Sequence, residues 1–231
     1  MSAPPRLDAA DRKAVAAFIS ANTQVLNPPL VPEIKLHLAE ESLPIWQKTE
    51  EELGEMNLPP PYWAFAWAGG QALARYILDN PQLLAGKRIT DLGTGSGLTA
   101  VAAMMAGAQH VLAADIDRFA LVATELNAAL NGVVVETTAA DLLSVAPQQA
   151  DVLLVGDLFY ERELSERVMR YIDGVAGKGA LVLVGDPQRN YFPKGRFASA
   201  AEYRVPVTRE LEDAEIKRSA VWRLVAPPLG G

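Results

Sequence analysis

The sequence predicts an α/β protein with a doubly wound, mostly parallel seven-stranded sheet, an antiparallel C-terminal hairpin and an N-terminal arm. From residue 88 onward, five short apolar runs alternate with segments of helical periodicity, the pattern of a parallel sheet covered by helices on both faces. Two more runs near the C-terminus have no long helix between them, which indicates an antiparallel pair. Residues 1–60 lack this alternation and are expected to form the arm, whereas residues 61–231 form the α/β domain.

The elements of the sheet follow from this alternation. Each parallel strand is short and continuously apolar, as strands buried on both faces are. The predicted parallel strands are 88–92, 110–114, 133–137, 152–155 and 180–184. The predicted helices between them are 98–106, 119–130 and 161–175. The predicted hairpin strands, 203–208 and 220–225, flank the segment 209–218 and close one edge of the sheet.

The arm has two recognisable parts. Residues 8–21 place apolar side chains at helical spacing behind two aspartates, and three prolines within residues 28–32 then predict an extended connection. Within residues 40–55, six glutamates accompany a single lysine. This segment is either the solvated face of a helix or a surface that attracts a basic partner.

Composition excludes several classes of function. The chain has 231 residues, 50% of them hydrophobic and 21% charged, and its net charge of −7 argues against nucleic acid as a partner. The absence of cysteine excludes disulfides, thiolate zinc sites and cysteine nucleophiles, and two histidines cannot form a three-histidine metal site. The apolar runs are shorter than a membrane helix requires, and the N-terminus has no signal-peptide pattern. A cytoplasmic protein without metal or membrane is expected.

A glycine-rich turn follows the first predicted strand. In Asp91-Leu-Gly93-Thr-Gly95-Ser-Gly97, three glycines alternate and an acid precedes them by two residues. Glycine lets the backbone lie against a ligand, and the next helix offers unpaired N–H groups to a carboxylate. The dinucleotide fingerprint has the different spacing G-x-G-x-x-G, and its pyrophosphate needs no acid nearby. An acid suits the ammonium of a bound amino acid, so the pattern favours S-adenosylmethionine over NAD; an ordinary tight turn is the alternative.

Acids also end the next two predicted strands. Asp115 follows the second strand about 20 residues beyond the glycines, the usual place for a partner of ribose hydroxyls. Asp141 follows the third strand and is expected to accept the adenine amino group, while Ile116 or Leu142 packs on the ring. One such acid alone can be a helix cap. Acids after three consecutive strands favour a bound nucleoside.

The fourth predicted strand ends in Asp157-Leu-Phe-Tyr160. A carboxylate and a phenol three residues apart then stand where a transferable methyl group would point. Asp157 can accept the N–H bonds of a neutral amine, and Tyr160 can wall the pocket. The alternative is that Asp157 caps the following helix and Tyr160 lies in the core.

Two further stretches allow two interpretations each. Half of the four tryptophans fall within residues 59–71, where Trp67 either roofs a cofactor pocket or only packs the arm against the domain. Residues 185–191, Gly-Asp-Pro-Gln-Arg-Asn-Tyr, follow the fifth predicted strand. This polar, turn-rich loop suits a substrate-facing position or a plain connection.

These residues together resemble the seven-stranded S-adenosylmethionine-dependent methyltransferases. The run Asp91–Gly97, Asp115 and Asp141 match the cofactor loops of that superfamily, and the two-stranded tail matches its last hairpin. The resemblance implies a Rossmann-like methyltransferase fold with S-adenosylmethionine as methyl donor and S-adenosylhomocysteine as product.

Within the superfamily, the chain is similar to the lysine methyltransferases with a D-x-x-Y motif, above all to those that modify the β subunit of electron-transfer flavoprotein. The similarity rests on residues 61–71, on Asp157-x-x-Tyr160 and on residues 185–189, within a likeness that spans about residues 30–224. Ala68 departs from the pattern, because proline is expected there.

This resemblance implies a protein-lysine N-methyltransferase whose partner is the flavoprotein β subunit. The residues implied to contact the cofactor are Trp67, Asp91, Gly93, Gly95, Gly97, Asp115 and Asp141, with Asp157 and Tyr160 at the amine. Related enzymes modify ribosomal proteins or small amines, and these acceptors stay open. A cofactor-binding interaction module without catalysis is a third possibility, against which the intact Asp157–Tyr160 motif weighs.

Overall fold

The computed structural model describes residues 8–39, 60–207 and 215–225. Its strands are β1 (Gln24–Leu26), β2 (Leu36–Leu38), β3 (Arg88–Leu92), β4 (His110–Ala114), β5 (Glu136–Thr138), β6 (Val152–Gly156), β7 (Leu181–Asp186), β8 (Phe197–Pro206) and β9 (Ile216–Leu224). Its α-helices are α1 (Arg12–Ala21), α4 (Ala68–Asp79), α5 (Leu98–Met105), α6 (Arg118–Leu130) and α7 (Arg162–Ala176). Single 3₁₀ turns are η1 (Tyr62–Ala64), η2 (Pro81–Leu83), η3 (Leu142–Ser144) and η4 (Lys194–Arg196).

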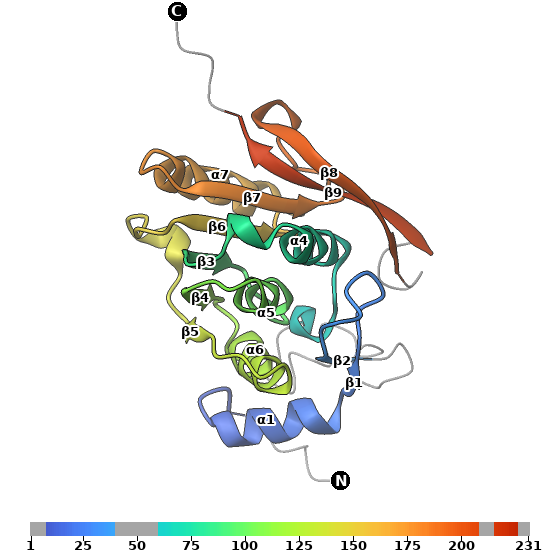
Figure 1. The fold of residues 1–231 in the computed structure, drawn as a ribbon. Coiled ribbons are helices and arrows are strands. Elements are labelled where there is room, and N and C mark those ends of the chain that lie inside the picture. The colour runs from blue at the N-terminus through green and yellow to red at the C-terminus, as the bar shows by residue number, and fades with distance from the viewer. Residues whose placement is uncertain (1–7, 40–59, 208–214, 226–231) are drawn as a thin grey trace, which may run out of the picture.

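A seven-stranded sheet runs through the molecule in the order β5-β4-β3-β6-β7-β9-β8 (Figure 1). β3 to β7 are mutually parallel, whereas β9 is antiparallel to both β7 and β8. The fold class expected from the sequence is therefore confirmed. The chain leaves β3 toward β4 on one side and later returns to place β6 on the other side. This reversal marks the switch point at which open α/β sheets bind ligands, beyond the carboxyl ends of the strands.

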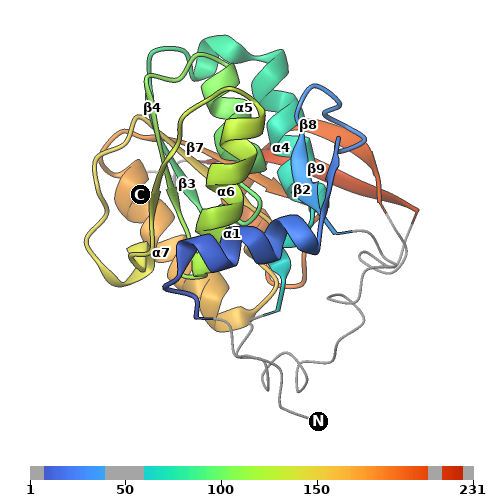
Figure 2. The same cartoon turned by 90° about the horizontal axis from the view of Figure 1, so that it is seen from below.

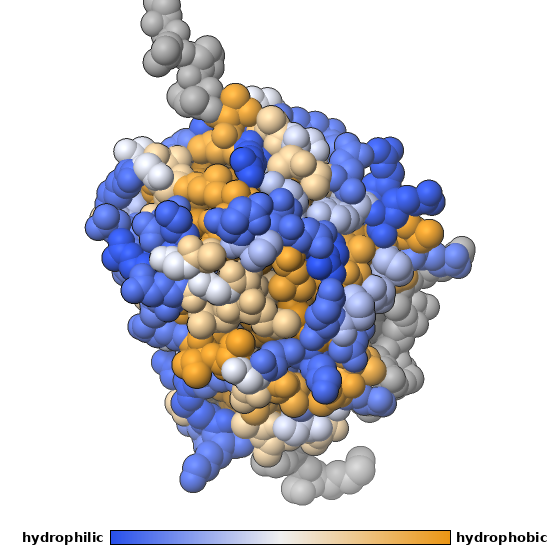
Figure 3. Space-filling model, viewed as in Figure 1, coloured by the Kyte–Doolittle hydropathy of each residue, from blue (hydrophilic) through white to orange (hydrophobic). Residues whose placement is uncertain are grey.

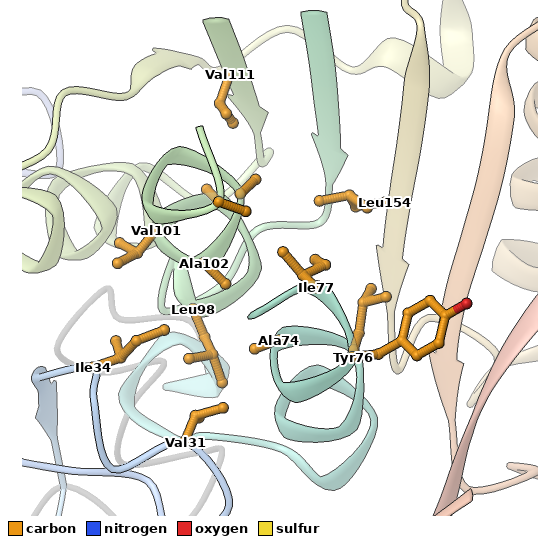
Figure 4. Packing of buried hydrophobic residues seen from close by; sticks show 14 of the residues in the cluster. Val31, Ile34, Ala74, Tyr76, Ile77, Leu98, Val101, Ala102, Val111 and Leu154 are labelled. Carbon is orange, nitrogen blue, oxygen red and sulfur yellow. The ribbon is translucent and has the colours of Figure 1, made fainter. Parts of the chain in front are cut away.

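Helices cover both faces of the sheet. α4 and α5 pack on one face, where their side chains meet those of β3, β4 and β6, and Figure 4 shows Ile77, Val101 and Leu154 in this core. α7 packs on the opposite face against a second cluster that includes Phe159 and Trp222. Because both faces of the central strands are buried, their continuous apolar runs in the sequence are explained.

The first helix lies against α6 (Figure 2). The Asp11 side chain accepts hydrogen bonds from two backbone N–H groups in the first turn and so caps α1. The rings of Phe18 and Phe119 meet edge to face at 5.9 Å. Between β1 and β2, Val31 and Ile34 are buried in the same core as α4 and α5. The proposed division of the chain at residue 60 stays a prediction.

β5, β8 and β9 each differ from the expected bounds by three residues or more at one end. β9 begins at Ile216 rather than at residue 220, within the segment 209–218 that was expected to connect the two hairpin strands. β5 begins three residues later than expected, because the Val133 N–H donates to the Ala128 carbonyl and thereby ends α6. β8 begins at Phe197 rather than at residue 203. It pairs with β9 from Phe197 through Pro206, across an irregularity between Ser199 and Ala201.

The arm and α4 differ from what the sequence predicts. The three prolines of residues 28–32 lie in a turn-containing loop between β1 and β2, which pair antiparallel, rather than in an extended connection. The sequence does not predict α4, because Gly69 and Gly70 in its first turn disfavour a helix. The acidic segment 40–55 and residues 208–214 lie outside the described part of the chain.

The surface in the orientation of Figure 1 carries separate hydrophobic patches among hydrophilic residues (Figure 3). No helix in the described ranges is long and apolar enough to cross a membrane. The same ranges contain no cluster of three His, Asp or Glu side chains that could hold a metal ion.

Candidate active site

A pocket of about 420 Å³ opens at the carboxyl ends of β3, β4 and β6. It lies at the switch point of the sheet, where a ligand is expected. Most of the predicted site residues meet there. Those that line the pocket are Trp67, Gly93, Gly95, Asp115, Ile116, Asp141, Leu142, Asp157 and Tyr160. Further lining residues include Tyr62, Leu158, Leu164, Arg167 and Arg189.

The glycine turn forms the floor between β3 and α5. All three of its glycines have positive φ, and Gly97 immediately precedes the first residue of α5. A Cβ at Gly97 would lie 2.8 Å from a methyl group of Thr124, so only glycine fits there. Gly97 does not line the pocket, and its effect on a ligand would pass through the shape of the turn. A Cβ at Gly95 would meet no atom within 4 Å, so this part of the turn faces open space.

Asp91 lies beneath the turn and does not line the pocket. It is fully buried, and its two oxygens accept hydrogen bonds from the hydroxyl groups of Thr94 at 2.6 Å and Thr99 at 2.7 Å. Burial raises the pKa of Asp91 to about 6. The carboxylate therefore holds the turn to the start of α5, and a contact with an ammonium group stays a prediction.

Asp115 faces the pocket from the end of β4. Oδ2 accepts the N–H of Gly95 at 3.0 Å and Oδ1 accepts the N–H of Asp117 at 3.0 Å. Burial raises the pKa of this carboxyl. A carboxylate has about four acceptor positions, so Asp115 keeps capacity for ligand hydroxyls. Beside it, the Ile116 side chain is 75% exposed, an apolar surface that a ligand could cover.

Asp141 has a more structural setting than the sequence indicates. It precedes η3, where Oδ1 accepts the Leu143 N–H at 3.0 Å. Oδ2 accepts the Ser144 hydroxyl at 2.6 Å and pairs with Arg167 at 2.5 Å. The Ser144 hydrogen bond, followed by Arg167, holds the pKa of Asp141 below its usual value. The adjoining Leu142 is buried and also lines the pocket.

Aromatic residues form one side of the pocket. Trp67 lies just before α4, and its indole N–H donates to the Tyr62 carbonyl at 2.9 Å. The Tyr62 ring centroid is 6.1 Å from that of Trp67 and 6.1 Å from that of Tyr160. Tyr160 is 46% exposed, so it does not lie in the core. Sequence reasoning singled out Trp67 and Tyr160 but missed Tyr62, although it belongs to the same aromatic block.

Asp157 follows β6 and is almost completely buried. Its φ of 56° is unusual for a residue other than glycine. Oδ2 accepts the N–H of Gly70 in the first turn of α4 at 2.8 Å. Oδ1 accepts the Arg189 Nε–H at 2.9 Å and lies 2.6 Å from Nη2 of the same guanidinium. Asp157 thus caps α4 rather than the helix that follows it in sequence, whose N-cap position is Glu161.

The loop after β7 brings two further polar residues beside Asp157. Arg189 lines the pocket, with its guanidinium over the Trp67 ring at 5.6 Å from the centroid. Asp186 is fully buried, and Oδ1 accepts the Arg189 backbone N–H at 2.7 Å. Burial, and next the charge of Asp157, raise the pKa of Asp186 to about 7. The sequence indicated a polar loop at residues 185–191, but it carried no signal for the pairing of Arg189 with Asp157.

The acceptor groups and apolar surfaces of the pocket fit an adenosyl amino acid. Asp115 retains acceptor capacity, Ile116 and Leu142 offer apolar surface, and Gly95 leaves room beside the backbone. At the other end, Asp157 and the aromatic side chains offer a carboxylate and π-faces, the groups that bind amines and their cations.

A family model and solved structures match this architecture. The model described as ribosomal protein L11 methyltransferase (PrmA) matches residues 71–158, from within α4 to the residue after Asp157. The ribosomal protein L11 methylase of Lactobacillus delbrueckii subsp. bulgaricus is 21% identical, with a TM-score of 0.53 over 87% of this chain and 100% of that chain. This likeness shows a shared fold.

Two curated relatives match over most of their length. The electron transfer flavoprotein beta subunit lysine methyltransferase of Danio rerio is 36% identical over 218 residues, 91% of this chain and 83% of that protein. The protein of the same name from Rattus norvegicus is 36% identical over 213 residues, 89% of this chain and 82% of that protein. Both matches extend well beyond the range of the family model.

Proposed function

The chain belongs to the family of electron transfer flavoprotein β-subunit lysine methyltransferases, and from this premise we propose that it methylates lysine side chains of that β subunit. It is an S-adenosylmethionine-dependent methyltransferase, so the family and the cofactor expected from the sequence are confirmed. One observation carries the proposal for the site: a single pocket is lined by cofactor-loop residues and by the Asp157–Tyr160 motif.

At the cofactor end of the pocket, different parts of S-adenosylmethionine are proposed to lie against the loops that follow different strands. Asp115 would hold the ribose hydroxyls, and Ile116 with Leu142 would flank the adenine, near Asp141. The turn from Gly93 to Gly97 would lie against the methionine portion. When bound, S-adenosylmethionine supplies an electrophilic methyl group, whose transfer to a neutral amine leaves S-adenosylhomocysteine and a methylated ammonium.

The amine end is proposed to be formed by Asp157 and Tyr160. A lysine has a reference pKa of about 10.4 and must reach the methyl group as the neutral amine. Asp157 would accept an N–H of that amine and fix its direction, since an in-line displacement depends on orientation. Burial raises the pKa of Tyr160, so its phenol keeps its proton at neutral pH. Tyr160 can therefore donate a hydrogen bond or wall the pocket, and a role as base is not proposed.

Two features support a protein as the acceptor. Tyr62 and Tyr160 are 50% and 46% exposed while they line the pocket, so they can contact chain on either side of an inserted lysine. The relatives named above carry a protein substrate in their names. The net charge of −7 makes nucleic acid a poor partner, and the proposed compartment is the cytoplasm.

A labelling experiment tests this proposal. The enzyme is incubated with methyl-labelled S-adenosylmethionine and, in separate reactions, purified electron transfer flavoprotein, ribosomal protein L11 and free lysine. We expect label in the flavoprotein β subunit, and far slower labelling of that subunit by Asp157→Asn. Label in L11 or free lysine alone would replace the proposed acceptor. Cofactor binding without label in any acceptor would support a non-catalytic module.

A further inference from the structure

The guanidinium of Arg189 lies between a carboxylate and an aromatic face. Its Nη2 and Nε atoms are 2.6 Å and 2.9 Å from Asp157 Oδ1, and its Cζ lies 5.6 Å from the centre of the Trp67 ring. All three side chains line the pocket. A cation of the enzyme itself therefore sits beside the proposed amine-binding carboxylate.

A carboxylate beside an aromatic face is the chemistry that binds a lysine ammonium or a methylated amine. Asp157 and Trp67 provide both groups, and Arg189 engages both. We propose that Arg189 is a specificity-determining residue that occupies the cation seat between Asp157 and Trp67, and that only an acceptor with further contacts displaces it. The proposal rests on the proposed function, because it takes this seat to be the entrance for the substrate lysine.

The backbone of Arg189 is fixed, so displacement would be a side-chain movement. Its N–H donates to the buried Asp186 at 2.7 Å, and its carbonyl accepts the Phe192 N–H at 2.9 Å. The preceding Gln188 has a φ of 63°, which confines this turn to one shape. The Arg189 side chain is 18% exposed, so part of it already reaches solvent, and displacement would require the guanidinium to turn outward.

Competition with a tethered cation disfavours small amines. The protein backbone holds the Arg189 guanidinium permanently near Asp157, so a free amine must displace it to bind. The apparent affinity of the free amine is therefore reduced in proportion to the fraction of time that the seat is open. A protein substrate gains contacts outside the seat, for example with the exposed rings of Tyr62 and Tyr160. Both acceptors must displace Arg189, but only the protein substrate offsets that cost with contacts outside the seat.

A binding experiment tests the seat without relying on turnover. Butyltrimethylammonium is titrated by calorimetry into the protein saturated with S-adenosylhomocysteine, for the parent, Arg189→Ala and Arg189→Gln. The control is Arg162→Ala, which removes a guanidinium over Tyr191 at the same 5.6 Å distance. We expect both Arg189 variants to bind the cation on the order of tenfold more tightly than the parent. This factor corresponds to a parent protein in which Arg189 leaves the seat open about a tenth of the time. The control should match the parent.

The kinetic counterpart uses Nα-acetyl-lysine methylamide as a small acceptor. In Arg189→Ala the KM for this small acceptor should fall on the order of tenfold relative to the parent. If Arg189 only holds Asp157 in place, turnover of both acceptors falls together and the titrated cation binds no more tightly; this result would overturn the proposal. If the parent methylates no flavoprotein, the proposed function fails, while the titration still decides the role of Arg189. Affinity for S-adenosylhomocysteine reports whether each variant is folded.

Discussion

Gly69 and Gly185 bring the first turn of α4 against β7 without space for a side chain between them. A Cβ at Gly69 would lie 2.3 Å from the Gly185 carbonyl oxygen, and one at Gly185 would lie 2.1 Å from the Gly69 carbonyl oxygen. Asp157 belongs to the same contact, because its N–H donates to the Gly185 carbonyl at 3.0 Å. The position of the proposed catalytic carboxylate therefore depends on two glycines that do not line the pocket.

Gly69→Ala should move α4 and Asp157 together. The added methyl group would also lie 2.5 Å from Asp157 Oδ2. Overpacking of this kind costs about 1–3 kcal/mol, so we expect a lower melting temperature and a lower methylation rate. Gly70→Ala is the matched control for stability, because its Cβ would meet only Leu98 Cδ2, at 4.0 Å. Equal melting temperatures for the two variants would contradict this account of the contact.

Part of this architecture is predictable from sequence. The bounds of β3 and β4 agree with those expected, because both are short segments bounded by turn-forming residues, Gly86 and Gly93 around β3 and Gly107 and Asp115 around β4. α4 escaped prediction because Gly69 and Gly70 disfavour helix locally, whereas close packing on β7 requires a glycine at position 69. The tertiary contact overrides the local propensity there.

The candidate site likewise has residues that the sequence can place and residues that it cannot. Turns that directly follow predicted strands, such as those with Gly93, Asp115 and Asp157, can be placed at one edge of the sheet from topology alone. The pairing of Arg189 with Asp157 joins residues 32 positions apart, and no local sequence pattern predicts it. Likewise, the hydrogen bonds of Asp91 with Thr94 and Thr99 emerge only when β3 and α5 are packed, and its proposed contact with a ligand stays a prediction.

Asp115→Ala should weaken the binding of S-adenosylhomocysteine. The substitution removes the expected ribose acceptor and the acceptor of the Gly95 N–H, which helps to shape the turn. Loss of a charged hydrogen-bond acceptor costs about 1–3 kcal/mol, roughly 10- to 100-fold in affinity. Calorimetry measures it, with Asp115→Asn as a milder variant that keeps one acceptor oxygen. If Asp115→Ala is folded and binds like the parent, Asp115 serves only as a structural acceptor.

Asp157→Asn should separate cofactor binding from turnover. The amide keeps one acceptor oxygen near α4 but loses the charge that faces Arg189 and the expected amine. We expect the affinity for S-adenosylhomocysteine to stay roughly intact and turnover to fall on the order of 10²-fold or more, because the lost interaction matters chiefly in the transition state. Steady-state methylation kinetics and calorimetry are compared on the same preparation. Near-parental turnover would restrict Asp157 to capping α4.

Asp186→Asn should change how stability depends on pH. Burial raises the pKa of Asp186 from 3.8 to about 7 in the folded protein, so its folded form resists ionisation. As pH rises from about 4 to about 7, the unfolded chain ionises at this residue first, and stability is lost until the folded group has also ionised. The asparagine variant avoids this loss. Its melting temperature relative to the parent should therefore rise between about pH 4 and about pH 7, by about 2–4 °C for each kcal/mol. A pH-independent difference would contradict the raised pKa.

The most direct measurement of the central claim is lysine methylation of electron transfer flavoprotein in the cells that make this enzyme. Peptide mass spectrometry of the β subunit is compared between parental cells, cells that lack the gene, and deleted cells that express either the parent enzyme or Asp157→Asn. The account predicts methylated lysine in parental cells, none after deletion, and restoration by the parent enzyme but not by Asp157→Asn. Methylation of the β subunit that is unchanged by deletion, or absent from all four samples, would contradict it.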